Sequence, residues 1–151
     1  MTVIQAEVSK AVAAPVRPAF VREVLRHAAE VPEVAARLTS DRATVAVRIT
    51  GDRELRRLNR DYAGEDSVTD VLSFAGDSDH LGDLAISWPM VQRQAAVHGH
   101  PETTELALLF VHGLLHLLGW DHATAPERRE MTRLTRAVLK RAGLTLARGR
   151  L

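Results

Sequence analysis

The amino-acid sequence predicts an α+β fold, in which a small mixed four-stranded sheet is packed with about five helices. Segments with the period-two alternation of strands come mostly in the first part of the chain, and segments with helical spacing of apolar residues come mostly later. This order is typical of a mixed sheet with helices packed on it. No repeat or long linker divides the chain, so we expect one domain over residues 1–145 and a short basic tail over residues 146–151.

Four segments are predicted to be strands. Residues 2–8 alternate weakly between apolar and polar side chains, which is typical of an edge strand. Residues 43–49 alternate with a period of two and are rich in β-branched residues. Residues 71–74 and 83–87 are separated by a turn rich in Gly and Asp, and this short spacing predicts an antiparallel hairpin.

Two helices are expected in the first half of the chain. The first begins at Pro15, since proline suits the first turn of a helix, and it carries apolar residues at helical spacing through Ala28. Asp52 is expected to cap the second, a short helix that continues to Leu58.

Three longer helices are expected in the second half, over residues 89–97, 102–118 and 126–142. Residues 102–118 are apolar nearly all round, which predicts the central buried helix of the fold. The last helix has one apolar stripe and is followed by Gly143, a residue typical of the position just after a helix.

The composition excludes several classes of protein. The chain has no Cys, so it forms no disulfide bond, and any metal site must use His, Asp or Glu. The first residues show no basic start followed by an apolar run, so we expect no signal peptide. The most apolar stretch, residues 106–118, has 13 residues, short of the roughly 20 that span a bilayer. We therefore expect a cytoplasmic protein with no membrane association.

The net charge of +1 does not by itself predict a polyanionic partner, but the charges are unevenly distributed. Residues 61–87 hold seven acidic residues and no Lys or Arg, whereas residues 126–151 hold eight basic residues and two acidic ones. The basic segment has two interpretations. It is either a solvated helix face followed by a mobile tail, or an electrostatic footprint for RNA phosphates.

Three histidines near the end of the predicted central helix indicate a metal site. His112 and His116 are four residues apart, so on a helix they lie on one face, about 5–6 Å apart at Cβ. Gly119 stands where the helix should end, because glycine takes the left-handed conformation that ends helices. The chain can then turn back and bring His122 to the same point. This spacing matches that of known three-histidine zinc sites.

The ligand set predicts the metal and the kind of chemistry. Three imidazoles suit zinc, and a site with no fourth protein ligand is of the catalytic type, with water at the open position. Zinc lowers the pKa of such a water to about 7, which makes a nucleophile available at neutral pH. A zinc peptidase of this spacing has Glu after the first histidine as general base, and this chain has Gly113 there. Peptidase activity is therefore disfavoured.

Asp121 is the candidate catalytic side chain because it adjoins His122. Its carboxylate either orients a ligand imidazole or acts on the zinc-bound water, or it simply caps the turn after the helix. His80, in the turn of the predicted hairpin, is a remote second ligand candidate. The other histidines are expected to be solvated: His27, His98 and His100.

Several motifs occur in the order typical of one family. They are Glu54-Leu55 with Leu58-Asn59 and Tyr62, then Thr69 to Phe74, Gly82 to Ser87, and His112-Gly113 through Asp121-His122. In these motifs, which cover most of the chain, the sequence resembles the YbeY family of bacterial zinc-dependent endoribonucleases. The resemblance implies a sheet flanked by helices, one zinc ion per chain held by the three histidines, and cleavage of single-stranded RNA. It also implies roles in ribosomal RNA maturation and ribosome quality control, with ribosomal RNA and the small ribosomal subunit as partners.

The chain departs from the family pattern just after Tyr62. The family usually has an arginine there that is tied to activity, whereas this chain has Ala63. An arginine would clamp a phosphate and offset the charge that develops in the transition state. Three alternatives stay open: Arg60 or Arg57 contacts the phosphate instead, another element supplies the contact, or catalysis is weak. Asp83 either lines the cleft with Asp70 or caps a turn. Thr69 and Ser73 are expected to satisfy the strand ends rather than to contact substrate.

These observations predict a single-strand-specific, zinc-dependent endoribonuclease. Two alternatives stay open. The first is a ribosome-assembly binding factor in which zinc mainly stabilises the fold and catalysis is weak or absent, an interpretation that Ala63 favours. The second is a metal-dependent peptidase or other hydrolase, which Gly113 disfavours.

Overall fold

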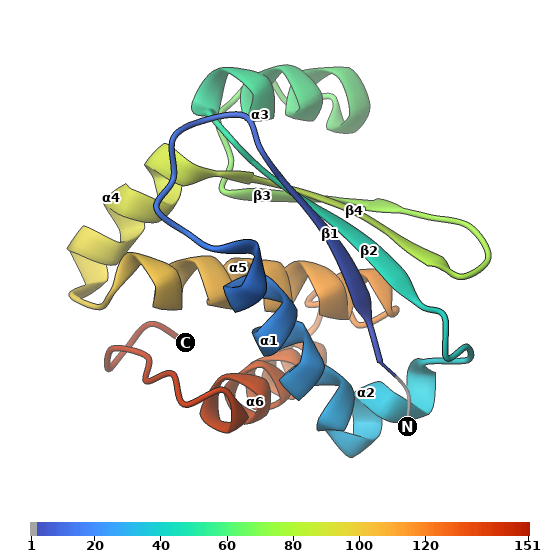
Figure 1. The fold of residues 1–151 in the computed structure, drawn as a ribbon. Helices are drawn as coiled ribbons and strands as arrows, with labels where there is room; N and C mark the ends of the chain where they lie inside the picture. Colours follow the sequence, from blue (N-terminus) through green and yellow to red (C-terminus); the bar gives the residue numbers. More distant parts are fainter. Residues whose placement is uncertain (1–2) are drawn as a thin grey trace.

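A computed structural model describes residues 3–151, and within them four strands form one mixed sheet (Figure 1). The strands are β1 (Gln5–Lys10), β2 (Thr44–Thr50), β3 (Val71–Ala75) and β4 (His80–Ser87), and their order across the sheet is β1-β2-β4-β3. β2 pairs in parallel with both β1 and β4, whereas β3 and β4 form an antiparallel hairpin. The mixed four-stranded sheet and its hairpin are confirmed.

β1 lies at the edge of the sheet, as the weak alternation predicts. The strand begins at Gln5, and the predicted start at Thr2 lies outside the described residues. At the other end of the hairpin, β4 begins at His80 rather than Asp83, because His80 and Gly82 already pair with β2.

The helices of the described residues include two short segments that the sequence did not predict. The unpredicted ones are α2 (Pro32–Arg37) and a π-helix, η1 (Asn59–Ala63). Both are too short to show a clear apolar stripe. The others are α1 (Pro18–Glu30), α3 (Asp52–Leu58), α4 (Trp88–His98), α5 (Glu102–Leu117) and α6 (Ala125–Arg141).

Two predictions about helix starts are wrong. α1 begins at Pro18, not Pro15, because a proline forces the preceding residue out of the helical region, and Arg17 is extended at φ −80° and ψ 137°. Asp52 does not cap α3, since Gly51 occupies the cap position. The Asp52 carboxylate instead accepts hydrogen bonds from Ser87 Oγ and Arg93 Nη2, which connect α3 to α4.

The sheet separates two layers of helix. α5 lies under one face together with α1 and α6, and α3 and η1 lie on the opposite face (Figure 1). α5 is the central buried helix, as predicted, because residues 104–111 are all buried. Glycine makes its close packing possible: a Cβ at Gly113 would lie 2.7 Å from Leu84 Cδ2 of β4. No helix in the described residues is long and apolar enough to cross a membrane.

Residues 146–151 are not a detached tail. They pass back toward the start of α5, where the Ala147 N–H donates to His100 Nδ1 at 3.0 Å and Arg150 forms an ion pair with Glu105. The interpretation of this segment as a solvated tail is therefore wrong for Ala147 and Arg150, which contact His100 and Glu105.

Candidate metal centre

The three predicted histidines converge. His112 and His116 project from one face of α5, with ring centroids 4.8 Å apart. The His122 ring lies 4.8 Å from that of His116 and 5.5 Å from that of His112. One ring nitrogen from each residue can be chosen so that all three lie within 4.8 Å of one another. Two nitrogens at 2.0–2.1 Å from one zinc ion lie at most about 4.2 Å apart, so the three rings would move slightly closer together when they hold the ion.

Gly119 ends α5 and lets the chain turn back, as predicted, so that His122 lies beside the other two histidines. Gly119 has φ +98°, a left-handed conformation that glycine adopts without strain. Its N–H donates to His116 O at 3.0 Å, and the next N–H, of Trp120, donates to Leu115 O at 3.0 Å. This pair of hydrogen bonds is a Schellman motif, which satisfies the last carbonyls of α5 while it reverses the chain.

Burial keeps the helical histidines in the form that binds metal. The pKa of His112 is lowered to about 4, mainly by burial and further by its two neighbouring imidazoles. The pKa of His116 is also lowered, again with burial as the largest cause. A neutral imidazole has a free lone pair for a metal, so this donor set fits a metal ion. The described residues thus contain a three-histidine group that could hold one.

Asp121 contacts the third histidine in two ways. Its Oδ1 accepts a hydrogen bond from the His122 backbone N–H at 2.7 Å, and the same oxygen lies 3.8 Å from His122 Nδ1. The first contact fixes the turn, and the second places a carboxylate beside the ring. A role for Asp121 in catalysis stays a prediction.

The histidines open onto a cavity of about 460 Å³ between α5, the start of β3 and the C-terminal segment. Asp70 lines it, and so do Thr69 and Ser73, which the sequence suggested as residues that satisfy the strand ends. The Asp70 carboxylate is held in place by the Val71 N–H at 2.8 Å and by Gln94 Nε2 at 3.3 Å. The other lining residues are Val71, Leu72, Leu108, Leu109, His112, Gly113, His116, His122, Arg150 and Leu151.

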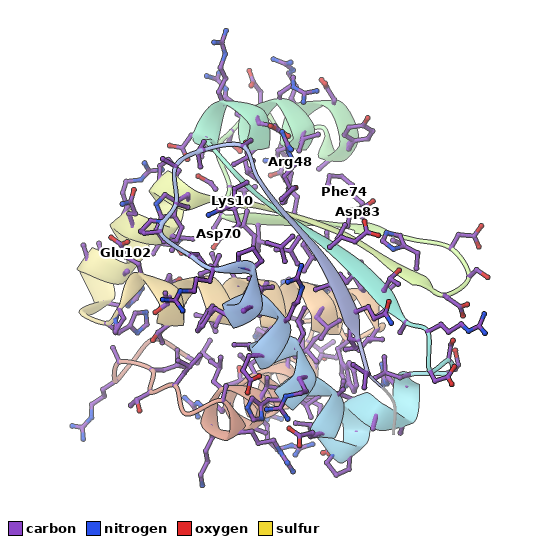
Figure 2. The ribbon with its side chains drawn as sticks, in the orientation of Figure 1. Lys10, Arg48, Asp70, Phe74, Asp83 and Glu102 are labelled. Atoms are coloured by element: carbon purple, nitrogen blue, oxygen red, sulfur yellow. The ribbon has the colours of Figure 1, made fainter. Side chains whose placement is uncertain are left out.

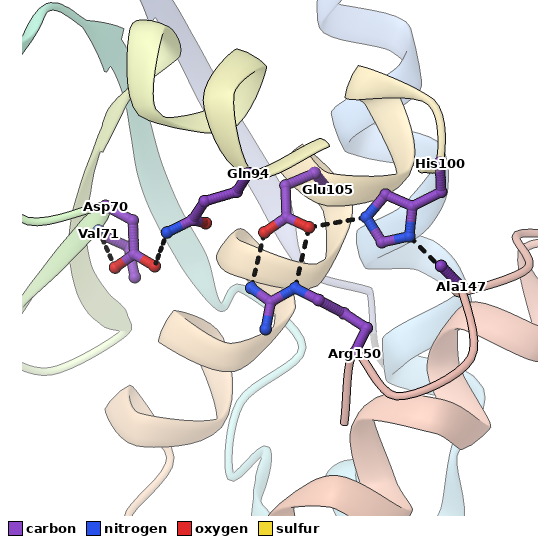
Figure 3. A network of polar contacts seen from close by, with 7 residues as sticks. All are labelled: Asp70, Val71, Gln94, His100, Glu105, Ala147 and Arg150. Carbon is purple, nitrogen blue, oxygen red and sulfur yellow. Dashed lines mark hydrogen bonds and ion pairs between the residues drawn. The ribbon is translucent and has the colours of Figure 1, made fainter. Parts of the chain in front are cut away.

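Arg150 also lines the cavity, and although the sequence placed it in the basic segment, no motif indicated that it reaches the histidines. Its Nε and Nη2 donate to the two carboxylate oxygens of Glu105 at 3.0 and 2.7 Å (Figure 3). Glu105 is fully buried and also receives the Nε2–H of His100 at 2.7 Å. Burial raises the pKa of Glu105, but the hydrogen bonds from Arg150 and His100 outweigh it, and the pKa is lowered overall. The prediction that His100 is solvated is wrong, since its side chain is only 3% exposed.

One signal in the sequence could have indicated this network. Glu105 stands in the first turns of a helix that is otherwise apolar nearly all round. A charge at such a position must be paired, because an unpaired carboxylate is seldom buried. The pattern does not say which basic residue supplies the partner, and Arg150 is 45 residues away.

Gly113 explains why a peptidase base is absent. The backbone of Gly113 lines the cavity beside His112 and His116, but a side chain there would start toward β4, where the Leu84 side chain occupies the space of the Cβ. A glutamate at this position would have to displace Leu84 before it could reach the metal site. The geometry therefore supports the expectation that peptidase chemistry is disfavoured.

The expected substrate-binding residues lie away from the histidines. Asp83 pairs in register with Phe74, and both side chains lie on the face of the sheet that α3 and η1 cover (Figure 2). Asp83 does not line the cavity, and its Oδ1 lies 3.0 Å from His80 Nε2. Arg60 belongs to η1, where its Nε donates to Asp61 at 3.2 Å.

His80 and Arg57 do not join the metal centre either. His80 is outside the three-histidine group, and its Nδ1 lies 2.8 Å from Thr44 Oγ1. Arg57 belongs to α3, on the other face of the sheet. Neither residue lines the cavity.

The fold and the site together define an α+β protein with a three-histidine metal-binding group at the end of its central helix. Comparison with known proteins gives the family. A sequence model of the family described as Endoribonuclease YbeY matches residues 5–143, and the chain belongs to this family.

Curated relatives agree with this assignment. The chain is 46% identical over 113 residues to the Endoribonuclease YbeY of Roseiflexus castenholzii, which covers 67% of this chain and 71% of the relative. It is 41% identical over 141 residues to that of Shouchella clausii, covering 83% and 85% of the two chains. The solution structure of TM1509 from Thermotoga maritima has the same fold, with a TM-score of 0.60, 19% identity and 90% of each chain covered.

Proposed function

We propose that this protein is a zinc-dependent endoribonuclease that cleaves single-stranded RNA in the maturation and quality control of ribosomal RNA. The observation that carries the proposal is the convergence of three imidazoles at the wall of an open cavity. The names of the curated relatives, Endoribonuclease YbeY, supply the reaction class. Ribosomal RNA and the small ribosomal subunit are the proposed partners, which places the protein in the cytoplasm.

His112, His116 and His122 would hold the zinc ion. When bound, zinc supplies a Lewis acid for a phosphate oxygen and lowers the pKa of water at its open position. The side chains around it do the positioning. Asp121, at 3.8 Å from His122 Nδ1, is proposed to fix the orientation of that ring.

The basic face of α6 is proposed to hold the RNA backbone. Arg128, Arg129 and Arg136 line a shallow hollow of about 710 Å³, and Arg128 also donates to His122 O at 3.4 Å. Arginines at such a surface bind phosphates in any sequence, which suits a nuclease without strict base recognition. Arg60 and Asp83 stay proposed substrate contacts. Because they lie on the opposite face of the sheet, they would contact a different part of the RNA.

The central test is cleavage of ribosomal RNA fragments by the purified, zinc-loaded protein. We expect cleavage of single-stranded segments, loss of cleavage with a chelator, and recovery on zinc addition. His116→Ala should lose both zinc and activity. If the zinc-loaded protein leaves these RNAs intact and a chelator makes no difference, the proposed enzyme function is wrong.

The second candidate function is a ribosome-assembly factor in which the metal stabilises the fold. Ala63, in place of the family arginine, favours it. In this case, His116→Ala would lower the melting temperature and abolish binding to the small subunit, with no cleavage to lose. Ala63→Arg separates the two candidates: a gain in cleavage rate would mean that the missing arginine limits an existing nuclease activity.

A further inference from the structure

Arg150 places a guanidinium beside the three histidines. It lines the same cavity as His112, His116 and His122, and it is the one Arg or Lys among the described residues that do so. Its side chain is 17% exposed, which is unusually low for an arginine on the surface. The cavity therefore has one positive group, in addition to any metal, that can meet a phosphate.

The carboxylate of Glu105 fixes the orientation of this guanidinium. It engages Nε and Nη2 through two parallel hydrogen bonds (Figure 3). Nη1 has no acceptor among residues 3–151, and it is not enclosed by protein. A planar guanidinium that is already held on one edge loses little freedom when its other edge binds an oxyanion.

His100 in turn holds Glu105. The Ala147 N–H donates to His100 Nδ1, so Nδ1 is the acceptor and the ring proton is on Nε2, which donates to Glu105. His100 and Glu105 are 3% and 0% exposed. A continuous set of buried hydrogen bonds thus runs from the backbone of the C-terminal segment to the guanidinium at the cavity.

We propose that Arg150 is a substrate contact, and that its Nη1 donates to a non-bridging oxygen of an RNA phosphate bound in the cavity. Glu105 and His100 are positioning residues that act through Arg150. This inference rests on the proposed endoribonuclease function. It also gives the site an arginine for the charge on the phosphate, although position 63 has none.

The test compares variants of the full chain loaded with zinc. Arg150→Ala removes the contact. The matched control is Arg148→Ala, because Arg148 is an exposed arginine two residues away that does not line the cavity. Arg150→Ala alone leaves the buried Glu105 carboxylate without its charged partner, which would disturb folding. The double variant Arg150→Ala with Glu105→Gln removes that charge, so it separates substrate binding from stability.

Three readouts distinguish the outcomes. We expect kcat/KM for single-stranded RNA to fall about 100-fold in both Arg150 variants, the usual effect of removing one donor to a developing oxyanion. Binding of a fluorescent 2′-deoxy strand, which has no 2′-hydroxyl, should weaken about tenfold, because a charge-assisted hydrogen bond is lost. Zinc content should be unchanged, and Arg148→Ala should stay within about twofold of wild type.

Two results would overturn the inference. One is a double variant that regains wild-type kcat/KM and strand affinity, since Arg150 would then serve only to neutralise Glu105. The other is an equal effect of Arg148→Ala, which would mean general charge attraction. If the wild-type protein binds the strand but cleaves no RNA, the proposed function fails, and the affinity of the Arg150 variants still decides whether this residue contacts the phosphate.

Discussion

The guanidinium of Arg37 lies over the ring of Trp120, with Cζ 3.7 Å from the ring centroid. The same side chain donates through Nη1 to Leu118 O at 3.0 Å, at the end of α5. Arg37 comes from α2, a helix far from the metal centre in sequence. It thus connects α2 to the turn that carries His122 back toward His112 and His116.

Arg37→Ala should therefore weaken metal binding more than it weakens the fold. The loss of an exposed cation–π contact lowers the free energy of unfolding by about 0.5–1 kcal/mol. Zinc affinity should fall roughly tenfold, as it does when groups that orient metal ligands are removed. Competition with a chromophoric chelator measures the affinity, and Arg42→Ala, at an exposed position without these contacts, is the control. Equal zinc affinities for the two variants would contradict this role.

Gly119→Ala should strain the same turn from within. At φ +98° a Cβ costs about 1–2 kcal/mol, and it would lie 3.3 Å from Arg37 Nη1. Gly143→Ala is a matched control, because Gly143 has φ +74° with open space around it and follows the C-terminal end of α6, outside the three-histidine group. Both Gly119→Ala and Gly143→Ala should lower the melting temperature, and only Gly119→Ala should also lower zinc affinity. A loss of zinc affinity in both would mean that general destabilisation is the cause.

The three-histidine group could be predicted from the sequence because its geometry is local. His112 and His116 share a face by helical periodicity, and Gly119 specifies the turn that brings His122 back within a few residues. The hairpin and the buried helix α5 follow in the same way from alternation and from a continuous apolar run.

The features that could not be predicted from the sequence depend on contacts between segments that are distant along the chain. Which face of the sheet Asp83 occupies is decided by its register against Phe74, and a shift of one residue would reverse it. The pairing of Glu105 with Arg150 depends on how the last residues pack, and no periodic pattern marks them. For the same reason, His100 was expected in solvent, although the packed C-terminal segment covers it.

Glu105→Ala should be strongly destabilising. Removing one member of a buried ion pair leaves the other without a partner and lowers the free energy of unfolding by about 3–5 kcal/mol. Urea unfolding measures the change. Glu102→Ala, in the first turn of the same helix, should change it by less than about 1 kcal/mol, since its only side-chain hydrogen bond in the described residues is a 3.5 Å one from Gln92. Similar losses for the two variants would show that the Glu105 network does not stabilise the fold.

The stability of the metal-free protein should fall as the pH is lowered from about 6.5 to about 4. The pKa of His112 is near 6.5 in an unfolded chain and about 4 in the folded protein, mainly because the ring is buried. Between these values the unfolded chain binds a proton that the folded protein does not, so protonation favours unfolding. The contribution of His112 to the free energy of unfolding is complete above pH 6.5 and amounts to roughly 3 kcal/mol at its maximum. The lowered pKa of His116 acts in the same direction.

His112→Gln isolates this effect, because glutamine is polar and does not titrate. The free energy of unfolding of the metal-free wild type and variant, measured by urea denaturation at a series of pH values, should differ most in slope between pH 6.5 and 4. The carboxylates titrate in both proteins and cancel in the difference. Parallel curves over this range would mean that His112 is no harder to protonate in the folded protein than in the unfolded chain. In that case the neutral, metal-ready state of the site would not come from burial.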